Sequence, residues 1–191
     1  MSEHALKSRL NKADVMGYLR TLVRHARRYW YYYVTPVAVA LAFNHYAMVG
    51  INVTQSLSDH VFLTIKGTFT PHRGEKMAFV WQGGGPYPKG VIFTKIVRGV
   101  PGDVVTRQGR DFYVNGDWVA TAKEYSSKGY PLDVGPTGVI PAGQYFVMTH
   151  HPDSYDSRYA TVGWIHQEHI VGKTIALFDW DEFRGLFKRE T

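Results

Sequence analysis

Cysteine is absent from this 191-residue sequence, and its absence removes several kinds of chemistry. Without cysteine there is no disulfide framework, no thiolate nucleophile and no cysteine-based zinc site. The bacterial periplasm stays open as a compartment, because disulfides are permitted there but not required.

Charge is also missing over a long stretch, since no Asp, Glu, Lys or Arg occurs between Tyr29 and Ser58. Residues 34–51 are mostly apolar, and their number approaches the roughly 20 residues that a spanning helix needs. Residues 29–33 are all aromatic, as is typical of a headgroup boundary. A buried core helix or a cleaved signal peptide would give a similar pattern, but the length of the run favours an uncleaved anchor. We therefore expect residues 29–51 to form a transmembrane signal-anchor.

The excess of basic groups is confined to the start of the chain. Residues 1–28 carry seven basic and two acidic groups, 7 − 2 = +5, and the other 163 residues carry 15 − 14 = +1 of the total of +6. A nucleic-acid partner is therefore not expected. The positive-inside rule predicts a cytoplasmic tail over residues 1–28 and an extracytoplasmic domain over residues 52–191. The tail suits either an amphipathic helix on an anionic membrane surface or a solvated, partly disordered segment.

After Val61 the sequence breaks into short apolar or alternating runs separated by Gly and Pro. This texture predicts strands at Val61–Ile65, Lys76–Trp81, Val91–Val97, Asp103–Thr106, Phe112–Val114, Trp118–Ala120, Gln144–Met148 and Ile170–Phe178. The Asn115-Gly116 dipeptide between two apolar runs is a strong hairpin signal. We expect a mainly β fold, an antiparallel barrel-like or orthogonal sheet domain behind the transmembrane helix.

Neither a phosphate loop nor a metal site is predicted. The run Gly83-Gly84-Gly85-Pro86 lacks the Gly-Lys-Ser/Thr of a phosphate loop, which favours a flexible surface turn. The pairs His150-His151 and His166/His169 lack the further ligands that a metal site requires. No cofactor is expected.

Three separate stretches contain the groups needed for Ser–Lys acyl transfer. Ser56 follows the apolar run, Lys95 lies in the apolar stretch 91–97 with no acid nearby, and 154–158 is a polar cluster. Serine is a weak nucleophile until a base removes its proton, and a lysine is such a base only when burial keeps it neutral. Taken singly, Lys95 could extend to water and Ser56 could be an ordinary polar residue at a membrane exit.

Together these stretches resemble the signal peptidase I family, and within it the conjugative-transfer branch of TraF-like pilin-maturing peptidases. The sequences that carry the resemblance are Asn52-Val53-Thr54-Gln55-Ser56-Leu57, Lys95-Ile96-Val97-Arg98-Gly99-Val100-Pro101-Gly102-Asp103 and Ser154-Tyr155-Asp156-Ser157-Arg158-Tyr159. The order and spacing agree from the apolar run to Phe178. The short span between the second and third stretches leaves little room for the large extra domain of housekeeping signal peptidases, which favours the conjugative branch.

The resemblance implies a role for each matching residue. Ser56 would be the nucleophile and Lys95 the general base. The Thr54 hydroxyl, together with the Ser56 backbone N–H, would stabilise the oxyanion. Ser154 would hydrogen-bond the Lys95 amine and orient it.

Two further matches imply structural roles. Asp156 and Arg158 would pair and fix the last loop, and Pro101-Gly102-Asp103 would form the turn that sets the lysine strand.

The sequence departs from the family pattern at three positions. Ser58 replaces a proline, His60 replaces a glycine, and Ile96 replaces the arginine after the lysine. Without the proline, Ser58 becomes a rival nucleophile, with Ser56 as the oxyanion donor. Ser56 is preferred because the residues on both sides of it then match.

The function expected from this resemblance is that of a single-pass inner-membrane serine endopeptidase with a periplasmic catalytic domain. Its partners would be the lipid bilayer and a pilin or another membrane-inserted precursor, which it would cleave and could cyclise. The alternatives are a general signal peptidase and a catalytically dead, membrane-tethered scaffold of a pilus or secretion assembly. The sequence does not indicate the oligomeric state.

Overall fold

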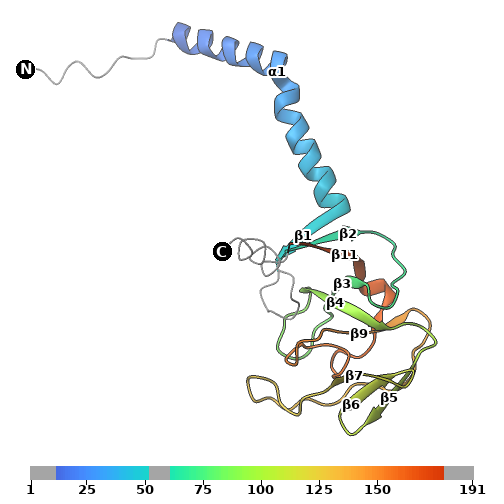
Figure 1. The fold of residues 1–191 in the computed structure, drawn as a ribbon. Coiled ribbons are helices and arrows are strands. Elements are labelled where there is room, and N and C mark those ends of the chain that lie inside the picture. Colours follow the sequence, from blue (N-terminus) through green and yellow to red (C-terminus); the bar gives the residue numbers. More distant parts are fainter. Residues whose placement is uncertain (1–11, 52–60, 179–191) are drawn as a thin grey trace, which may run out of the picture. The chain divides into compact units, whose positions relative to one another are not determined.

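The computed structural model describes residues 12–51 and 61–178, which divide into two compact units at His45/Tyr46. The first unit contains helix α1, Lys12–Tyr46, and the second contains the strands (Figure 1). The three predicted residues of the nucleophile segment, Thr54, Ser56 and Ser58, lie outside the described residues.

Helix α1 differs from the predicted anchor at both ends. It begins 17 residues before Tyr29, so residues 12–28 of the basic tail are helical, and Tyr29 interrupts it with non-helical angles (φ −115°, ψ 20°). It ends at Tyr46, where the prediction continued to Ile51. In the part of the chain that the structure describes, no helix combines the length and hydropathy needed to cross a bilayer.

Residues 47–51, which follow α1, form a strand because they pair with a neighbouring strand. Strand β1, Ala47–Ile51, pairs antiparallel with β2, Val61–Lys66, from Ala47↔Ile65 to Ile51↔Val61. The prediction that the helix includes residues 47–51 is therefore wrong. An apolar run of this length suits either state, and sheet pairing decides between them.

A seven-stranded sheet makes up most of the second unit. Its order is β1-β2-β11-β3-β4-β9-β10, with neighbouring strands antiparallel throughout. The strands not yet bounded are β3 (Lys76–Val80), β4 (Ile92–Gly99), β9 (Gln144–Met148), β10 (Ile165–His166) and β11 (Ile170–Phe178). A short 3₁₀ helix, Gln167–His169, joins the last two.

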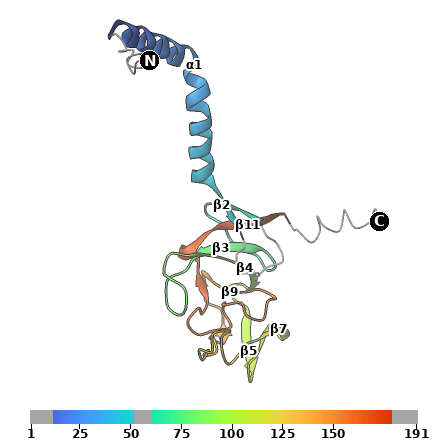
Figure 2. The same cartoon turned by 90° about the vertical axis from the view of Figure 1, so that its left-hand side faces the viewer.

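A smaller four-stranded sheet, order β7-β6-β5-β8, is built from the chain between β4 and β9. Its strands are β5 (Val104–Gln108), β6 (Asp111–Val114), β7 (Asp117–Thr121) and β8 (Gly138–Val139). In both views this sheet lies beyond β9, away from β1 and β2 (Figures 1 and 2). The predicted hairpin at Asn115-Gly116 is confirmed: both residues have positive φ, 52° and 91°, as a type I′ turn requires.

The antiparallel, mainly β fold and all eight predicted strands are confirmed, with small shifts of their ends. The core falls into two clusters. One joins the two sheets through Phe112, Ile140 and Phe146, and the other lies around Met77, Val97 and Val147. Strand β4 contributes to the second cluster, so a side chain on that face of β4 is surrounded by packed apolar groups.

Candidate active site

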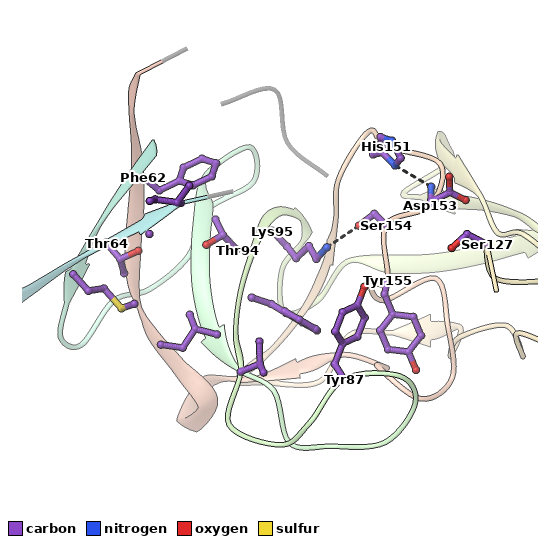
Figure 3. A pocket seen from close by; sticks show the side chains of 16 residues that line it. Phe62, Thr64, Tyr87, Thr94, Lys95, Ser127, His151, Asp153, Ser154 and Tyr155 are labelled. Carbon is purple, nitrogen blue, oxygen red and sulfur yellow. Dashed lines mark hydrogen bonds between the residues drawn. The ribbon is translucent and has the colours of Figure 1, made fainter. Parts of the chain in front are cut away.

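Lys95 lies in the middle of β4 and is only 5% exposed. Its Nζ donates a hydrogen bond to Ser154 Oγ at 2.8 Å (Figure 3). The Phe93 ring centroid lies 5.6 Å from the same nitrogen. The structure thus brings together two residues that are 59 positions apart in the sequence.

Burial lowers the pKa of Lys95 from 10.5 to about 8. The Asp156 carboxylate opposes this shift and the Arg158 guanidinium adds to it. A charged amine loses hydration in such a site, so a larger fraction of the amine is neutral at a given pH. A lysine in this state can accept a proton close to neutral pH.

Asp156 and Arg158 form a buried ion pair in the loop that carries Ser154. Arg158 Nε lies 2.8 Å from Asp156 Oδ1, and Nη2 lies 2.9 Å from Oδ2, a bidentate arrangement. Their side chains are 0% and 3% exposed. The pair holds the backbone of the loop, because Arg158 also donates to the Ser154 carbonyl at 3.0 Å and to the Thr121 carbonyl at 3.1 Å.

The same loop is attached to β9 and to the chain before β8. Val147 N–H donates to Ser157 Oγ, and Ser157 N–H donates to the Val147 carbonyl, both at 3.0 Å. Gly135 packs against this segment so closely that a Cβ would lie 2.3 Å from the Ser157 carbonyl oxygen. These contacts fix Ser154 relative to β4.

A cavity of about 530 Å³ opens in front of Lys95 and Ser154 (Figure 3). Its walls come from β1, β2, β4, the loop before β4 and the loop after β9. The lining residues are Met48, Gly50, Ile51, Phe62, Thr64, Tyr87, Val91, Ile92, Phe93, Thr94, Lys95, Ser127, His151, Asp153, Ser154 and Tyr155. Most of them are apolar or aromatic, so the cavity suits an uncharged peptide segment.

Gly85, the last residue of the glycine run 83–85, packs against the aromatic wall of this cavity. A Cβ on Gly85 would lie 2.2 Å from Tyr155 Oη, and all three glycines have positive φ. Tyr87 follows, with its ring centroid 5.8 Å from that of Tyr155. Gly85 thus leaves room for the side chain next to Ser154. Sequence reasoning missed Tyr87 and Tyr155 as lining residues. Only the adjacency of Tyr155 to Ser154 could have drawn attention to either.

The predicted turn after the lysine strand is present. Asp103 N–H donates to the Val100 carbonyl at 3.0 Å, and Val100 N–H donates to Asp103 Oδ2 at 2.8 Å, with Gly102 at φ 90° between them. Arg73 Nε reaches Asp103 Oδ2 at 2.7 Å. This turn lies at the end of β4, on the far side of Val97 from Lys95.

The histidines occupy separate positions. Arg98 contacts His150, His151 Nδ1 accepts from Asp153 N–H at 3.2 Å, and the rings of His166 and His169 are 5.9 Å apart. Within residues 12–51 and 61–178, no group of three or more metal-binding side chains gathers.

Comparison with known proteins assigns the chain to a family. The family described as "Signal peptidase, peptidase S26" matches residues 26–180. A crystal structure of a signal peptidase I from Enterococcus faecalis V583 is also similar. It is 24% identical, with 56% of this chain and 98% of that chain covered, and has a TM-score of 0.38. No curated protein matches the chain. Since the family match spans most of its length, the chain belongs to the peptidase S26 signal peptidases, a family of membrane-associated serine peptidases.

Proposed function

We propose that the chain is a Ser–Lys endopeptidase in which Ser56 is the nucleophile and Lys95 the general base. The observation that carries this proposal is the buried Lys95 amine, hydrogen-bonded to Ser154 and facing a cavity. With a pKa lowered to about 8, a useful fraction of the amine is neutral near neutral pH. A scaffold without catalytic activity would have no need of a buried lysine with a shifted pKa, which argues against that alternative.

Two described residues near the predicted nucleophile segment support its place in the site. Ile51 ends β1 and Phe62 is the second residue of β2, and both line the cavity that Lys95 faces. The proposal requires the residues between them to bring Ser56 within hydrogen-bond reach of Lys95 Nζ.

The reaction follows from these roles. The Ser56 oxygen attacks the substrate carbonyl carbon while its proton passes to Lys95, and the electron pair of the C=O bond moves to the oxygen. Thr54 and the Ser56 N–H stabilise that oxyanion. When the intermediate collapses, the C–N bond breaks and Lys95 returns the proton to the departing amine. Ser154 keeps the lysine amine directed toward the reaction throughout.

The acyl-enzyme then has two outcomes. Water releases a carboxylate, whereas an amine of the same substrate closes a ring. The group that is better positioned and better able to reach the ester decides between them.

An apolar sheet face supports a lipid bilayer as a partner. The register places Val49, Leu63 and Ile175 in one row across β1, β2 and β11, with side chains on one face. The exposed large apolar residues of these strands are Val49, Ile51, Ile65, Ile175 and Leu177. An exposed apolar area of this kind is typical of a surface that binds a membrane or another protein.

We propose a single-pass location in the bacterial inner membrane, with the N-terminus in the cytoplasm and the unit that contains the strands, from β1 onward, in the periplasm. The uncharged stretch from Tyr29 to Ser58 and the basic segment before it support this topology. A reporter that is active only outside the cytoplasm, fused after Thr191, should be active. A fusion that works only in the cytoplasm would contradict the topology.

For the substrate we propose a pilin precursor of a conjugation system. The chain between β4 and β9 forms only the four-stranded sheet and its loops, and this small size supports a dedicated enzyme. A general signal peptidase that acts on many exported proteins is equally compatible with the family. Purified protein offered a conjugative pilin precursor and a set of unrelated exported precursors should cleave the pilin selectively. Equal cleavage of all of them would favour the general enzyme.

The nucleophile is tested with two serine variants. Ser56→Ala should abolish cleavage while leaving the protein folded, because nucleophile and base act as one unit. Ser58→Ala is the matched control and should retain most of the activity. The opposite result, an active Ser56→Ala and an inactive Ser58→Ala, would move the nucleophile to Ser58.

A further inference from the structure

Thr149, the residue after β9, carries a hydroxyl group without a hydrogen-bond partner. The residue is 0% exposed, and its Oγ1 meets no donor or acceptor among the residues that the structure describes. Leaving a buried hydroxyl unpaired is unfavourable, because no hydrogen bond compensates for the water it has lost. Such a group calls for an explanation, and a valine would fill the same space without this cost.

The sheet register identifies the neighbour of Thr149. Strands β4 and β9 pair with Ile96 opposite Met148 and Val97 opposite Val147. One step further along this antiparallel ladder, Thr149 lies opposite Lys95. Directly opposite residues point to the same face of a sheet, so the two side chains are neighbours.

The backbone hydrogen bonds give the type of this pair. Val97 N–H donates to the Glu75 carbonyl, so the polar groups of Val97, and by alternation those of Lys95, point toward β3. Thr149 N–H points away from β4, to Asp156 Oδ2 at 3.4 Å. Lys95 and Thr149 therefore occupy a non-hydrogen-bonded position, where Cα atoms are about 4.5 Å apart and side chains approach most closely.

We propose that the Thr149 hydroxyl is a positioning group for Lys95, accepting a hydrogen bond from its ammonium form during catalysis. This inference rests on the proposed role of Lys95 as general base. When Lys95 takes the proton of the nucleophile, its amine has three N–H groups. One is directed to Ser154 Oγ and one to the reacting atoms, and Thr149 Oγ1 accepts the third. The bond is released when the proton passes to the leaving amine.

The charged groups near Lys95 affect its pKa in a different way from the uncharged Thr149 hydroxyl. Asp156 and Arg158 influence its pKa from the loop beside it, and His151 and Asp153 lie on the cavity wall. Thr149 has no charge, so it affects Lys95 through a hydrogen bond alone. Removing the hydroxyl should favour the neutral amine without altering the other groups.

The test compares Thr149→Val, which keeps the shape of the side chain, with Thr149→Ser, which keeps the hydroxyl. Thr149→Val should lower kcat about ten-fold and move the rising limb of its pH profile about one unit to lower pH, since a hydrogen bond to a charged group is lost. Thr149→Ser should stay close to the parent protein in both. Above about pH 8, where the Lys95 amine is neutral and the hydroxyl has no ammonium group to accept from, Thr149→Val should unfold at the same temperature or higher, because the unpaired hydroxyl is gone.

Thr174→Val is a matched control on the same sheet. Thr174 is also buried, but its hydroxyl is 2.9 Å from that of Thr64, so its loss should lower the unfolding temperature and leave the pH midpoint unchanged. A Thr149→Val protein with parental kcat and pH midpoint would overturn the proposal.

A second readout separates this inference from the proposed function. The pKa of Lys95 can be followed by NMR of the lysine side chain in the whole protein, without a substrate. A lower pKa in Thr149→Val than in the parent supports the contact even if no peptidase activity is found. An unchanged pKa contradicts it even if the enzyme is active.

Discussion

The loop beside Lys95 and the turn that ends its strand both depend on an aspartate paired with an arginine, yet the two pairs differ in burial. In the loop, the side chains of Asp156 and Arg158 are 0% and 3% exposed. In the turn, those of Asp103 and Arg73 are 7% and 51% exposed. The carboxylate is buried in both regions, whereas the arginine is buried only next to the site.

This difference decides what each arginine does. Arg158 donates to three backbone carbonyls besides the Asp156 carboxylate. Its guanidinium therefore supplies hydrogen bonds that water would otherwise give to these buried groups. Asp103 has other donors, the Val100 N–H at 2.8 Å and the Asn115 amide at 3.1 Å, and Arg73 is one partner among several. The loop near Lys95 thus depends on the single guanidinium of Arg158, whereas several donors share the carboxylate of the turn.

The largest effect is expected from Lys95 itself. Lys95→Met should lower activity roughly 10⁴-fold or more, because the base is lost. It should also stabilise the fold by about 3 kcal/mol at pH 7, since the parent buries a charge whose pKa falls from 10.5 unfolded to about 8 folded. Chemical denaturation at several pH values, together with a cleavage assay, measures both.

The lowered pKa of Lys95 also predicts the direction in which the stability of the parent protein changes with pH. Between pH 8 and 10.5 the folded lysine is neutral while the unfolded one is still protonated, so the stability of the parent rises with pH through this window. Lys95→Met lacks this rise, and its advantage should shrink accordingly. Lys128→Met, at an exposed lysine, is the control and should change stability little. A parent protein whose stability is flat between pH 8 and 10.5 would contradict the buried-lysine account.

The second effect comes from the buried pair. Arg158→Gln should destabilise the fold by roughly 3–5 kcal/mol, because Asp156 is left charged and unpaired in the interior. Activity should fall with it, as the loop that holds Ser154 loosens. The double variant Asp156→Asn/Arg158→Gln should be less destabilised than Arg158→Gln alone. Equal losses of stability in the single and the double variant would mean that the unpaired Asp156 carboxylate is not the cause of the destabilisation.

The sequence predicted elements whose pattern is local. Short apolar or alternating runs bounded by Gly and Pro identified eight of the eleven strands that the structure describes, and Asn115-Gly116 identified a hairpin because few other residues accept two positive φ angles in succession. The strands β8 and β10 have two residues each and are too short to alternate. Residues 47–51 follow the helix without a break, and only their pairing with β2 reveals a strand.

The site was predicted by resemblance more than by pattern. An apolar run around Lys95 is ordinary, and its contact with Ser154 joins positions that no local signal relates. Thr149 could not be found at all from the sequence. The role proposed for it rests on the register of β4 against β9 and on the absence of a partner for its hydroxyl among the described residues.

The smallest effect is expected from the turn. Arg73→Gln should cost only about 0.2–1 kcal/mol, because the exposed half of the pair is removed and Asp103 keeps the donors from Val100 and Asn115. Burial alone would raise the pKa of Asp103, but the hydrogen bonds from Arg73, Val100 and Asn115 outweigh it and hold the pKa below its usual value. That stability is present above the unfolded pKa of the carboxyl and is lost as the pH falls through the folded one. Arg73→Gln should therefore lose less stability on acidification than the parent, with cleavage activity unchanged at neutral pH. Denaturation curves at neutral and acidic pH measure this loss of stability. If Arg73→Gln destabilises the fold as much as Arg158→Gln does, then burial of the arginine does not distinguish the two regions.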